Sequence, residues 1–425
     1  MEQAKTDKAN NRSFESILGT LSKVFLYVLL IYFPLYELFL HFLQSYTHFS
    51  DSLIFWITHF YEPLIVLFLL VYLIKFALDR KFPLSKGDIY AAVIIILALL
   101  MIAVHRSNLQ AGLQGLRFLI LPYAAYLIAR FSNYKNTHRL IQVYLFIAGI
   151  MAAMAIVEYF FLPRGYMDIY YNLSGFGFGQ NTLPNTTQAT AILAGPNQLA
   201  SYLILPFFYL LHRFFTSKRS VLLVFDSYLL IIITLAIGLT YSRSALIGLI
   251  IGSIFALIYF GRGQRDKVIY SVLFIVLAIT LAASYALSNG ELPRDLLTHG
   301  SSFTLHLQAT SGSFKTFISG GIFKIIFGFG VGSAGPVALK LGGIISENYY
   351  LQVCFELGIL GLAIYILFIA QLLRGLFKGS KTLFFALIAL LVNAFFLHIF
   401  SDNPAMAVSV FIIIATALGI RESTN

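Results

Sequence analysis

The chain has 425 residues, of which 59% are hydrophobic and only 11% are charged, and its mean hydropathy is +0.84. A soluble core could not enclose this much apolar surface, so the composition excludes a soluble globular protein and indicates a membrane protein. The net charge is +11 without a nucleic-acid-binding motif, and a single cysteine excludes a disulfide framework or a cysteine-rich metal site.

Apolar segments in chain order predict the fold class. A helix needs about 20 apolar residues to cross the hydrocarbon, and twelve segments satisfy this. The sequence therefore predicts an all-α polytopic membrane protein with about twelve transmembrane helices. The expected spans centre near Leu30, Leu69, Ile95, Leu121, Gly149, Leu205, Leu230, Ile251, Leu277, Ile364, Leu387 and Ile412.

The spans divide the chain into five parts. Residues 1–20 are expected to form a cytoplasmic tail, 21–287 a bundle of nine spans, 288–346 a large periplasmic loop, 347–420 three further spans and 421–425 a second cytoplasmic tail. The polar N-terminal tail and the length of the first apolar segment favour a retained span over a cleaved signal peptide.

Basic residues predict the orientation. Most of the 29 Lys and Arg residues fall in alternate connections, such as Arg130 to Arg139 and Arg213 to Arg219. Because cytoplasmic loops are enriched in Lys and Arg, both termini are predicted to be cytoplasmic, and this bias explains the net charge without a nucleic-acid partner.

Two long loops are predicted on the opposite, outer side. Residues 162–195 are rich in Gly, Asn and Thr, and residues 288–346 mix polar and short apolar stretches. Within the second loop, the apolar run 317–327 predicts an amphipathic helix on the outer surface. The string from Gly330 to Gly335 fits a dinucleotide fingerprint but lacks the βαβ context, so cofactor binding is not expected there.

The segment that begins Glu347-Asn348-Tyr349 places a carboxylate and an amide at the mouth of a hydrophobic helix. An ionisable group at the centre of a spanning helix costs about 2.5–3.5 kcal/mol on insertion scales, so its default interpretation is functional. Glu347 can serve as a general base, and it can also act as an N-terminal cap.

Three further residues on the predicted outer side complete a candidate catalytic group. Arg243 follows Thr240-Tyr241-Ser242, Arg117 lies near the outer end of the fourth span, and His306 lies in the large loop. An arginine offers a planar donor fork suited to phosphate, and a carboxylate can accept a proton from a sugar hydroxyl. Snorkelling arginines, lipid headgroup contacts and a surface histidine are the structural alternatives.

Three stretches resemble the bacterial O-antigen ligase and O-antigen polymerase superfamily of membrane glycosyltransferases. Residues 195–200 resemble its Asn-containing span start, residues 240–244 resemble its Ser-Arg signature, and residues 347–361 resemble its polar pair followed by nine residues and Gly-x-x-Gly. Ligases of this family usually carry histidine where this chain has Glu347. That difference favours a repeat-unit polymerase.

The resemblance implies a GT-C-like enzyme that uses an undecaprenyl-pyrophosphate-linked glycan at the periplasmic face of the inner membrane, without metal or cofactor. It implies Glu347 as base and Arg243 as pyrophosphate clamp, with His306 or Arg294 in place of a second loop arginine. Expected partners are the lipid-linked donor and acceptor, the bilayer and a chain-length regulator. Substrate binding is assigned to Arg117, Arg294, Asn348, Tyr349 and Asn197.

Two alternatives remain at this stage. A ligase would move the finished glycan onto a lipid A core or a protein. A transporter or flippase would use intramembrane acids as a proton relay, but no broken-helix pair or internal repeat accompanies them. The candidate acids are Glu37, Glu62, Glu158, Asp226 and Glu356.

Overall fold

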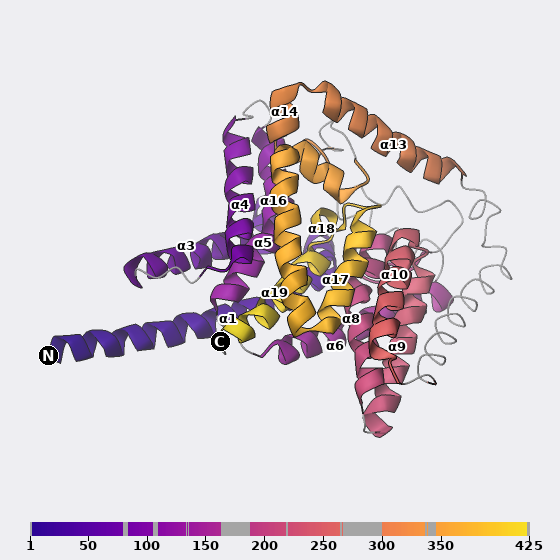
Figure 1. Cartoon of the computed structure of the whole chain (residues 1–425), viewed down its shortest axis with the longest axis horizontal. Coiled ribbons are helices and arrows are strands. Elements are labelled where there is room, and N and C mark those ends of the chain that lie inside the picture. The colour runs from indigo at the N-terminus through magenta and orange to yellow at the C-terminus, as the bar shows by residue number, and fades with distance from the viewer. Residues whose placement is uncertain are drawn as a thin grey trace.

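The computed structural model describes residues 2–79, 84–104, 109–132, 134, 136–162, 188–217, 220–263, 266, 300–335, 338 and 346–422, and its elements there are helices (Figure 1). Eight of these helical segments are long and apolar enough to cross a membrane. They are α1 (Glu2–Tyr46), α2 with α3 (Asp51–Thr58 and Tyr61–Asp79), α4 (Lys86–Val104), α5 (Leu109–Phe131), α6 (Thr137–Phe161), α8 (Pro196–Thr216), α10 (Arg243–Phe260) and α16 (Tyr349–Gly379).

Three further apolar helices are α9 (Ser220–Leu239), α17 (Lys381–Ala394) and α19 (Pro404–Glu422), whose apolar stretches are shorter. The predicted all-α polytopic membrane class is therefore confirmed. All predicted span centres lie in these helices except Leu277, which is outside the described residues. The count of twelve spans and the GT-C-like topology stay predictions.

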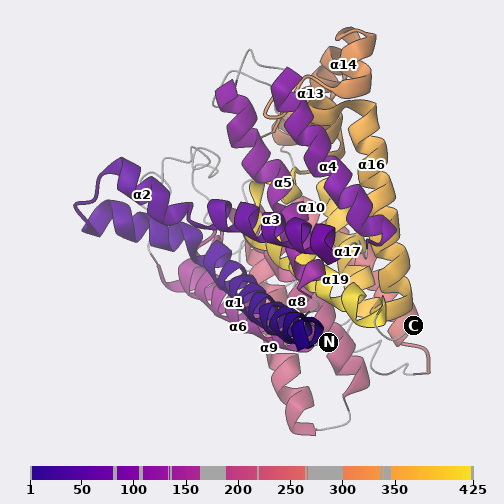
Figure 2. The same cartoon turned by 90° about the vertical axis from the view of Figure 1, so that its left-hand side faces the viewer.

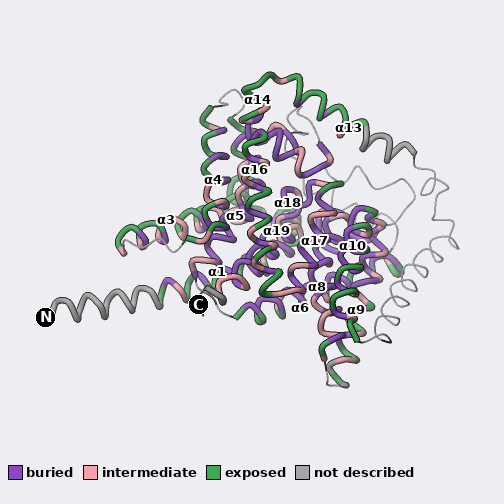
Figure 3. Tube along the Cα trace, viewed as in Figure 1, coloured by how far each residue is buried: buried purple, intermediate pink, exposed green. Residues whose placement is uncertain are grey.

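Helices that are far apart in the sequence pack side by side. α4 packs against α16, α5 against α19 and α10 against α17 (Figures 1 and 2). Faces directed into the bundle are buried, whereas large apolar side chains on the outer faces are exposed (Figure 3). Exposed apolar faces around a buried core are what a bilayer solvent permits, because lipid tails are as apolar as leucine.

Hydrogen bonds join the starts of three helices at one end of the bundle, which we call the site end, and attach the start of a fourth helix to the end of α17. Ser242 before α10 donates to Asn197 in α8, and Asn403 before α19 donates to the backbone of Gln198 in α8. Asn348, the N-cap of α16, donates to the carbonyl of Phe395 at the end of α17. The site end therefore collects segments from positions 197 to 403.

The helix after Glu347 is not continuous. Gly358 has φ 72° and ψ −175°, which breaks α16 into a short first part and a long second part. A side chain at Gly358 would place its Cβ 2.1 Å from the Ile326 carbonyl oxygen, so only glycine fits. Glu347 thus heads a short bent helix, whereas the sequence predicted the mouth of an uninterrupted span.

The glycine string between residues 328 and 335 fills the space beside this break. A Cβ at Gly332 would lie 2.2 Å from the Ala111 carbonyl oxygen of α5, and one at Gly335 would lie 2.5 Å from Nε2 of Gln352 in α16. The Phe329 amide donates to the Phe355 carbonyl at 2.6 Å. These glycines permit the string to pack closely between α5 and α16.

The apolar run 317–327 does not form one helix. α13 (Gly300–Ser319) ends before Gly320, and α14 (Ile322–Phe327) begins after Gly321, whose φ is 83°. Phe317 packs against Phe355, whereas apolar side chains of α14 are exposed (Figure 3). The glycine pair bends the chain so that α14 packs against α16.

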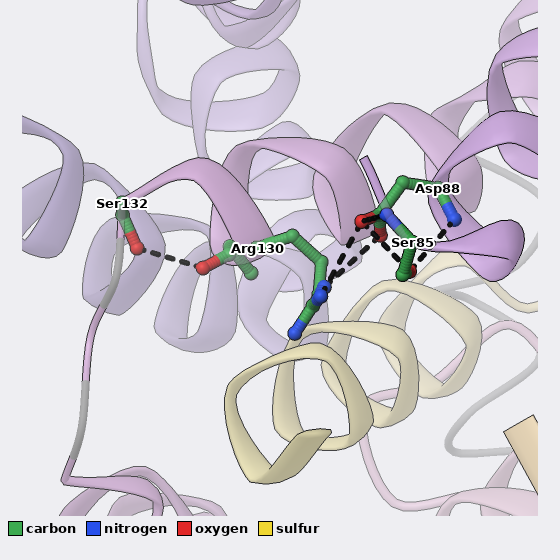
Figure 4. A network of polar contacts seen from close by, with 5 residues as sticks. Ser85, Asp88, Arg130 and Ser132 are labelled. Carbon is green, nitrogen blue, oxygen red and sulfur yellow. Dashed lines mark hydrogen bonds and ion pairs between the residues drawn. The ribbon is translucent and has the colours of Figure 1, made fainter. Parts of the chain in front are cut away.

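An ion pair joins two helices at the opposite end of the bundle. Nε of Arg130 in α5 lies 3.0 Å from Oδ1 of Asp88 in α4, and the two side chains are only 5% and 1% exposed. Asp88 also accepts from the backbone and hydroxyl of Ser85 (Figure 4). The pair leaves neither charge unpaired where α4 begins and α5 ends.

Replacing Asp88 with alanine should destabilise the protein by about 3–5 kcal/mol, because Arg130 would remain buried without a counter-charge. Unfolding in detergent can be followed by the reaction of a thiol dye with Cys354, which is buried and is the single cysteine of the chain. The exposed Asp266→Ala change is the matched control. The double variant Asp88→Ala/Arg130→Leu should recover most of the lost stability. Equal stability of Asp88→Ala and the native protein would contradict the role of the buried ion pair.

Candidate functional site

Glu347 lies on a turn that is held on both sides. Before it, the Ser346 carbonyl accepts from Thr310 of α13 at 3.3 Å. After it, Asn348 accepts from the Leu351 amide at 3.0 Å and donates to the Phe395 carbonyl at 2.7 Å. Asn348 therefore provides the cap of α16, and Glu347 is left partly exposed at the site end.

The backbone of this turn is strained. Glu347 has φ 52°, and two other non-glycine residues, Ala191 and Tyr241, have φ 52° and 53°. Positive φ is costly for residues with a Cβ and persists where the surroundings over-determine it, often at functional sites. Each of the three lies shortly before a helix start at the site end, so strained turns precede α8, α10 and α16.

Arg243 is the first residue of α10, and its side chain is exposed. The Ser242 hydroxyl donates to Oδ1 of Asn197 at 2.6 Å, which fixes the start of α10 against the start of α8. Within the described part of the chain, the Arg243 guanidinium has no carboxylate partner. A helix N-terminus with a permanent cation is an arrangement that binds anions.

Asp402 joins the site from the last connection of the chain, at the end of α18 (Ile399–Asp402). Its Oδ2 accepts from Nε2 of Gln198 at 3.2 Å and lies 3.6 Å from Nε2 of His398. Its side chain is 9% exposed, and Oδ1 is buried without a hydrogen-bond partner among the described residues. The sequence interpretation did not include Asp402.

The electrostatic surroundings of Asp402 connect it to Glu347. Burial raises the pKa of Asp402 from its ordinary value of 3.8 to about 6. His398 opposes this rise, and the negative charge of Glu347 adds to it. Burial is thus the main cause of the raised pKa of Asp402, and Glu347 has the smallest effect on it.

Two cavities adjoin this end. The first, of about 430 Å³, lies between α1, α2, α5 and the starts of α8 and α19, and Asp402 and Arg117 line it. The second is an apolar groove of about 420 Å³ between α10, α16 and α17. The groove is lined by Ile247, Ile251, Tyr350, Ile388, Leu391, Val392, Phe395 and Phe396.

The predicted substrate-binding residues have different surroundings. Nε of Arg117 lies 3.0 Å from Oε1 of Glu62, and its guanidinium lies over the Phe55 ring, at the first cavity. The Tyr349 ring is in the core, and its hydroxyl lies 3.3 Å from that of Tyr123. Tyr349 therefore packs the bundle.

The side chains of the two loop residues predicted to assist Arg243 lie outside what the structure describes. His306 belongs to α13, but its side chain lies outside what the structure describes, and Arg294 lies wholly outside the described residues. Ser242, which directly precedes Arg243, donates to Asn197, and the next residue, Gln198, donates to Asp402. The start of α8 therefore contacts both Asp402 and the segment that carries Arg243.

The intramembrane acids form separate contacts rather than a chain. Glu158 accepts from the Thr190 and Ala191 amides at 3.0 and 2.7 Å and supports the turn before α8. Asp226 pairs with Arg213 at 3.0 Å toward the opposite end, and Glu356 accepts from Gln352 at 3.3 Å. Glu62 pairs with Arg117, and Glu37 lines the first cavity.

Asp402 and Gln198 were missed because they are separated by 204 positions and become neighbours only on folding. A local signal existed in Ser401-Asp402-Asn403-Pro404, a polar stretch between two apolar segments with proline at a helix start. Gln198 lies directly after the predicted Asn197. A search for polar helix starts would have found both.

No known protein family, curated protein or solved structure matches this chain. The resemblance to the O-antigen ligase and polymerase superfamily therefore stays a prediction from three motifs.

The raised pKa of Asp402 predicts how pH changes stability. Because the fold favours the protonated carboxyl, its contribution is complete below the ordinary pKa of 3.8 and is lost as pH rises through about 6. The thermal midpoint of the native protein, followed by circular dichroism across about pH 4–8, should fall over this window. Asp402→Asn should remove that fall. The control variant Asp266→Asn should keep the native pH profile of the thermal midpoint. An equal profile for Asp402→Asn and the native protein would contradict this role of Asp402.

Proposed function

We propose that this protein is a membrane glycosyltransferase that joins one polyprenyl-pyrophosphate-linked repeat unit to another. The single observation that carries the proposal is the position of the Glu347 turn between two different cavities. Asn348 and Tyr350 attach the turn to the wall of the apolar groove, and Gln352 of the same short helix accepts from Ser401, the neighbour of Asp402 at the first cavity. A transferase needs such a group between its two substrates.

The groove and Arg243 together suit a lipid pyrophosphate. Ile247 and Ile251 follow Arg243 by four and eight residues, so they continue the same face of α10 into the groove. An apolar chain in the groove would be shielded from water, while its pyrophosphate would meet an exposed guanidinium at a helix N-terminus. This arrangement supports assigning the groove to the donor lipid.

The proposed reaction needs one base and one clamp. The Glu347 carboxylate takes the proton of an acceptor hydroxyl, whose oxygen forms a bond to the anomeric carbon of the donor. The bond between this carbon and the pyrophosphate oxygen breaks, and polyprenyl pyrophosphate leaves with its charge stabilised by Arg243. Gln198, Asp402 and His398 position the groups around the base.

The basic residues at the opposite end of the bundle support the orientation of the site. By the positive-inside rule, the site end would face the outer side of the cytoplasmic membrane, where lipid-linked repeat units are presented to a polymerase. A chain-length regulator on that side is part of the same proposal.

The test is a gel assay of the reconstituted protein with intact lipid-pyrophosphate-linked repeat units as sole substrate. The native protein should produce a ladder. Glu347→Gln should lower the rate by about 10²–10⁴, the usual contribution of a general base. Arg243→Ala should lower it by about 10²–10³ and Arg243→Lys by less, because lysine keeps the charge without the donor fork.

The matched controls lie away from the site end. Arg139→Ala and Asp266→Asn alter exposed charges and should leave the ladder unchanged. Native-like activity of Glu347→Gln or Arg243→Ala would refute its assigned role. A ladder that appears only after a lipid A core or protein acceptor is added would identify a ligase.

Filling the groove should weaken donor binding specifically. Ile247→Trp should raise the donor concentration for half-maximal rate about tenfold, equivalent to about 1.4 kcal/mol, with little change in the maximal rate. Phe255→Trp on an exposed face of the same helix is the control. A fall in maximal rate alone would contradict the assignment of the groove to the donor lipid.

A further inference from the structure

The first cavity has the size and lining of a binding site for a small polar ligand. Its volume of about 430 Å³ falls within the range of about 300–1,000 Å³ typical of ligand pockets. Its lining includes the aromatic residues Phe33, Tyr36, Phe55 and Phe118 and the amide residues Gln44, Gln114 and Gln198. Rings that offer flat apolar faces beside amides suit sugar units, which present both C–H faces and hydroxyl groups.

One polar group in this cavity lacks the partner that its burial demands. Asp402 lines the cavity, its side chain is 91% buried, and Oδ1 has no hydrogen-bond partner among the described residues. An unsatisfied buried acceptor costs about 1–3 kcal/mol, and more if it is charged. A ligand hydroxyl or ammonium group that donates to Oδ1 would remove this cost.

The charges around the cavity discriminate between ligands. Glu37, Asp51 and Asp402 contribute three carboxyl groups. Arg117 and His59 are the basic residues of the lining, and the permanently charged guanidinium of Arg117 is already paired with Glu62 at 3.0 Å. A ligand phosphate or uronate would therefore meet three carboxylates, and like charges repel.

The acidic groups are also spread over the wall. They come from α1, α2 and α18, and within the described residues no three His, Cys, Asp or Glu side chains gather closely enough to hold one metal ion. A ligand with several donors distributed over more than one ring fits this spacing.

We propose that the first cavity binds the accepting glycan and that the sugar units entering it are neutral or carry free amino groups. The inference rests on the proposed function, and it adds the location and chemical class of the acceptor. Glu347 then lies between an anionic donor at Arg243 and an acceptor held by carboxylates, so the opposite charge character of the two sites keeps each substrate in its own site.

The test measures binding of three trisaccharides of equal length to the full chain in detergent by saturation-transfer NMR. The probes are maltotriose, the glucosamine trisaccharide of chitosan and trigalacturonate, which are neutral, cationic and anionic. The first two should bind with dissociation constants of up to about 10 mM, and the dissociation constant of the anionic probe should be at least tenfold higher. Trigalacturonate binding as tight as that of maltotriose, or no binding of any probe, would overturn the proposal.

Variants locate the binding. The double variant Glu37→Gln/Asp51→Asn should weaken binding of the glucosamine trisaccharide about tenfold and change maltotriose binding little. The difference in affinity between maltotriose and trigalacturonate should become smaller. Asp266→Asn, an exposed acid outside the cavity, is the matched control and should preserve the order of the three probes. An unchanged order in the double variant would overturn the assignment to this cavity.

The two proposals fail in different ways. Arg243→Ala should abolish the ladder of the polymerase assay but leave trisaccharide binding intact. If the native protein makes no ladder while the trisaccharides bind in the expected order, the polymerase proposal fails and the glycan site stands. If the ladder forms but the trisaccharides do not follow the charge order, the acceptor inference fails alone.

Discussion

Pairing of polar groups is the constraint on which the site end depends. In hydrocarbon there is no water to satisfy an exposed amide, hydroxyl or carboxylate, so such groups must find partners within the protein. Asn197 accepts from Ser242, and Gln198 accepts from Asn403 and donates to Asp402. These contacts hold the starts of three helices together, and the candidate functional groups consequently lie on rigid helix ends.

The break in α16 is the second determinant of the site. Because Gly358 leaves the helical conformation, the first part of α16 bends away from the span that follows. The bend admits the glycine string between α5 and α16, where Gly332 contacts the backbone of α5 and Gly335 contacts the Gln352 side chain more closely than a Cβ would allow. The short helix then carries Tyr350, which lines the groove, and Gln352, which accepts from Ser401 next to Asp402 of the first cavity.

The electrostatic character of the two cavities differs for a physical reason. The groove beside Arg243 is formed by exposed apolar faces of α10, α16 and α17, which lipid can cover without a desolvation cost. The first cavity is enclosed by helix ends and connections that retain Glu37, Asp51 and Asp402. The two sites therefore select for different ligands. A permanent cation lies next to the apolar groove, whereas acids line the first cavity.

A broken helix is also a feature of transporters. The sequence showed no broken-helix pair, whereas the structure contains one such break, at Gly358. Glu158, however, accepts from the turn before α8, and Asp226 of α9 pairs with Arg213 of α8 toward the opposite end of the bundle. A continuous path of titratable groups between these acids is therefore not formed by the described residues.

Apolar length and the positions of basic residues determined the membrane class by themselves, because about 20 consecutive apolar residues are a local property of the chain. The same local pattern indicated Arg243 and Glu347, since polar residues at the edges of apolar segments are costly enough to signify a role, whereas Asn197 was predicted from the motif resemblance. Only the tertiary structure brought Gln198 to Asp402 across 204 positions and divided α16 at Gly358. Those outcomes depend on which helices pack together, and neither composition nor spacing specifies that choice.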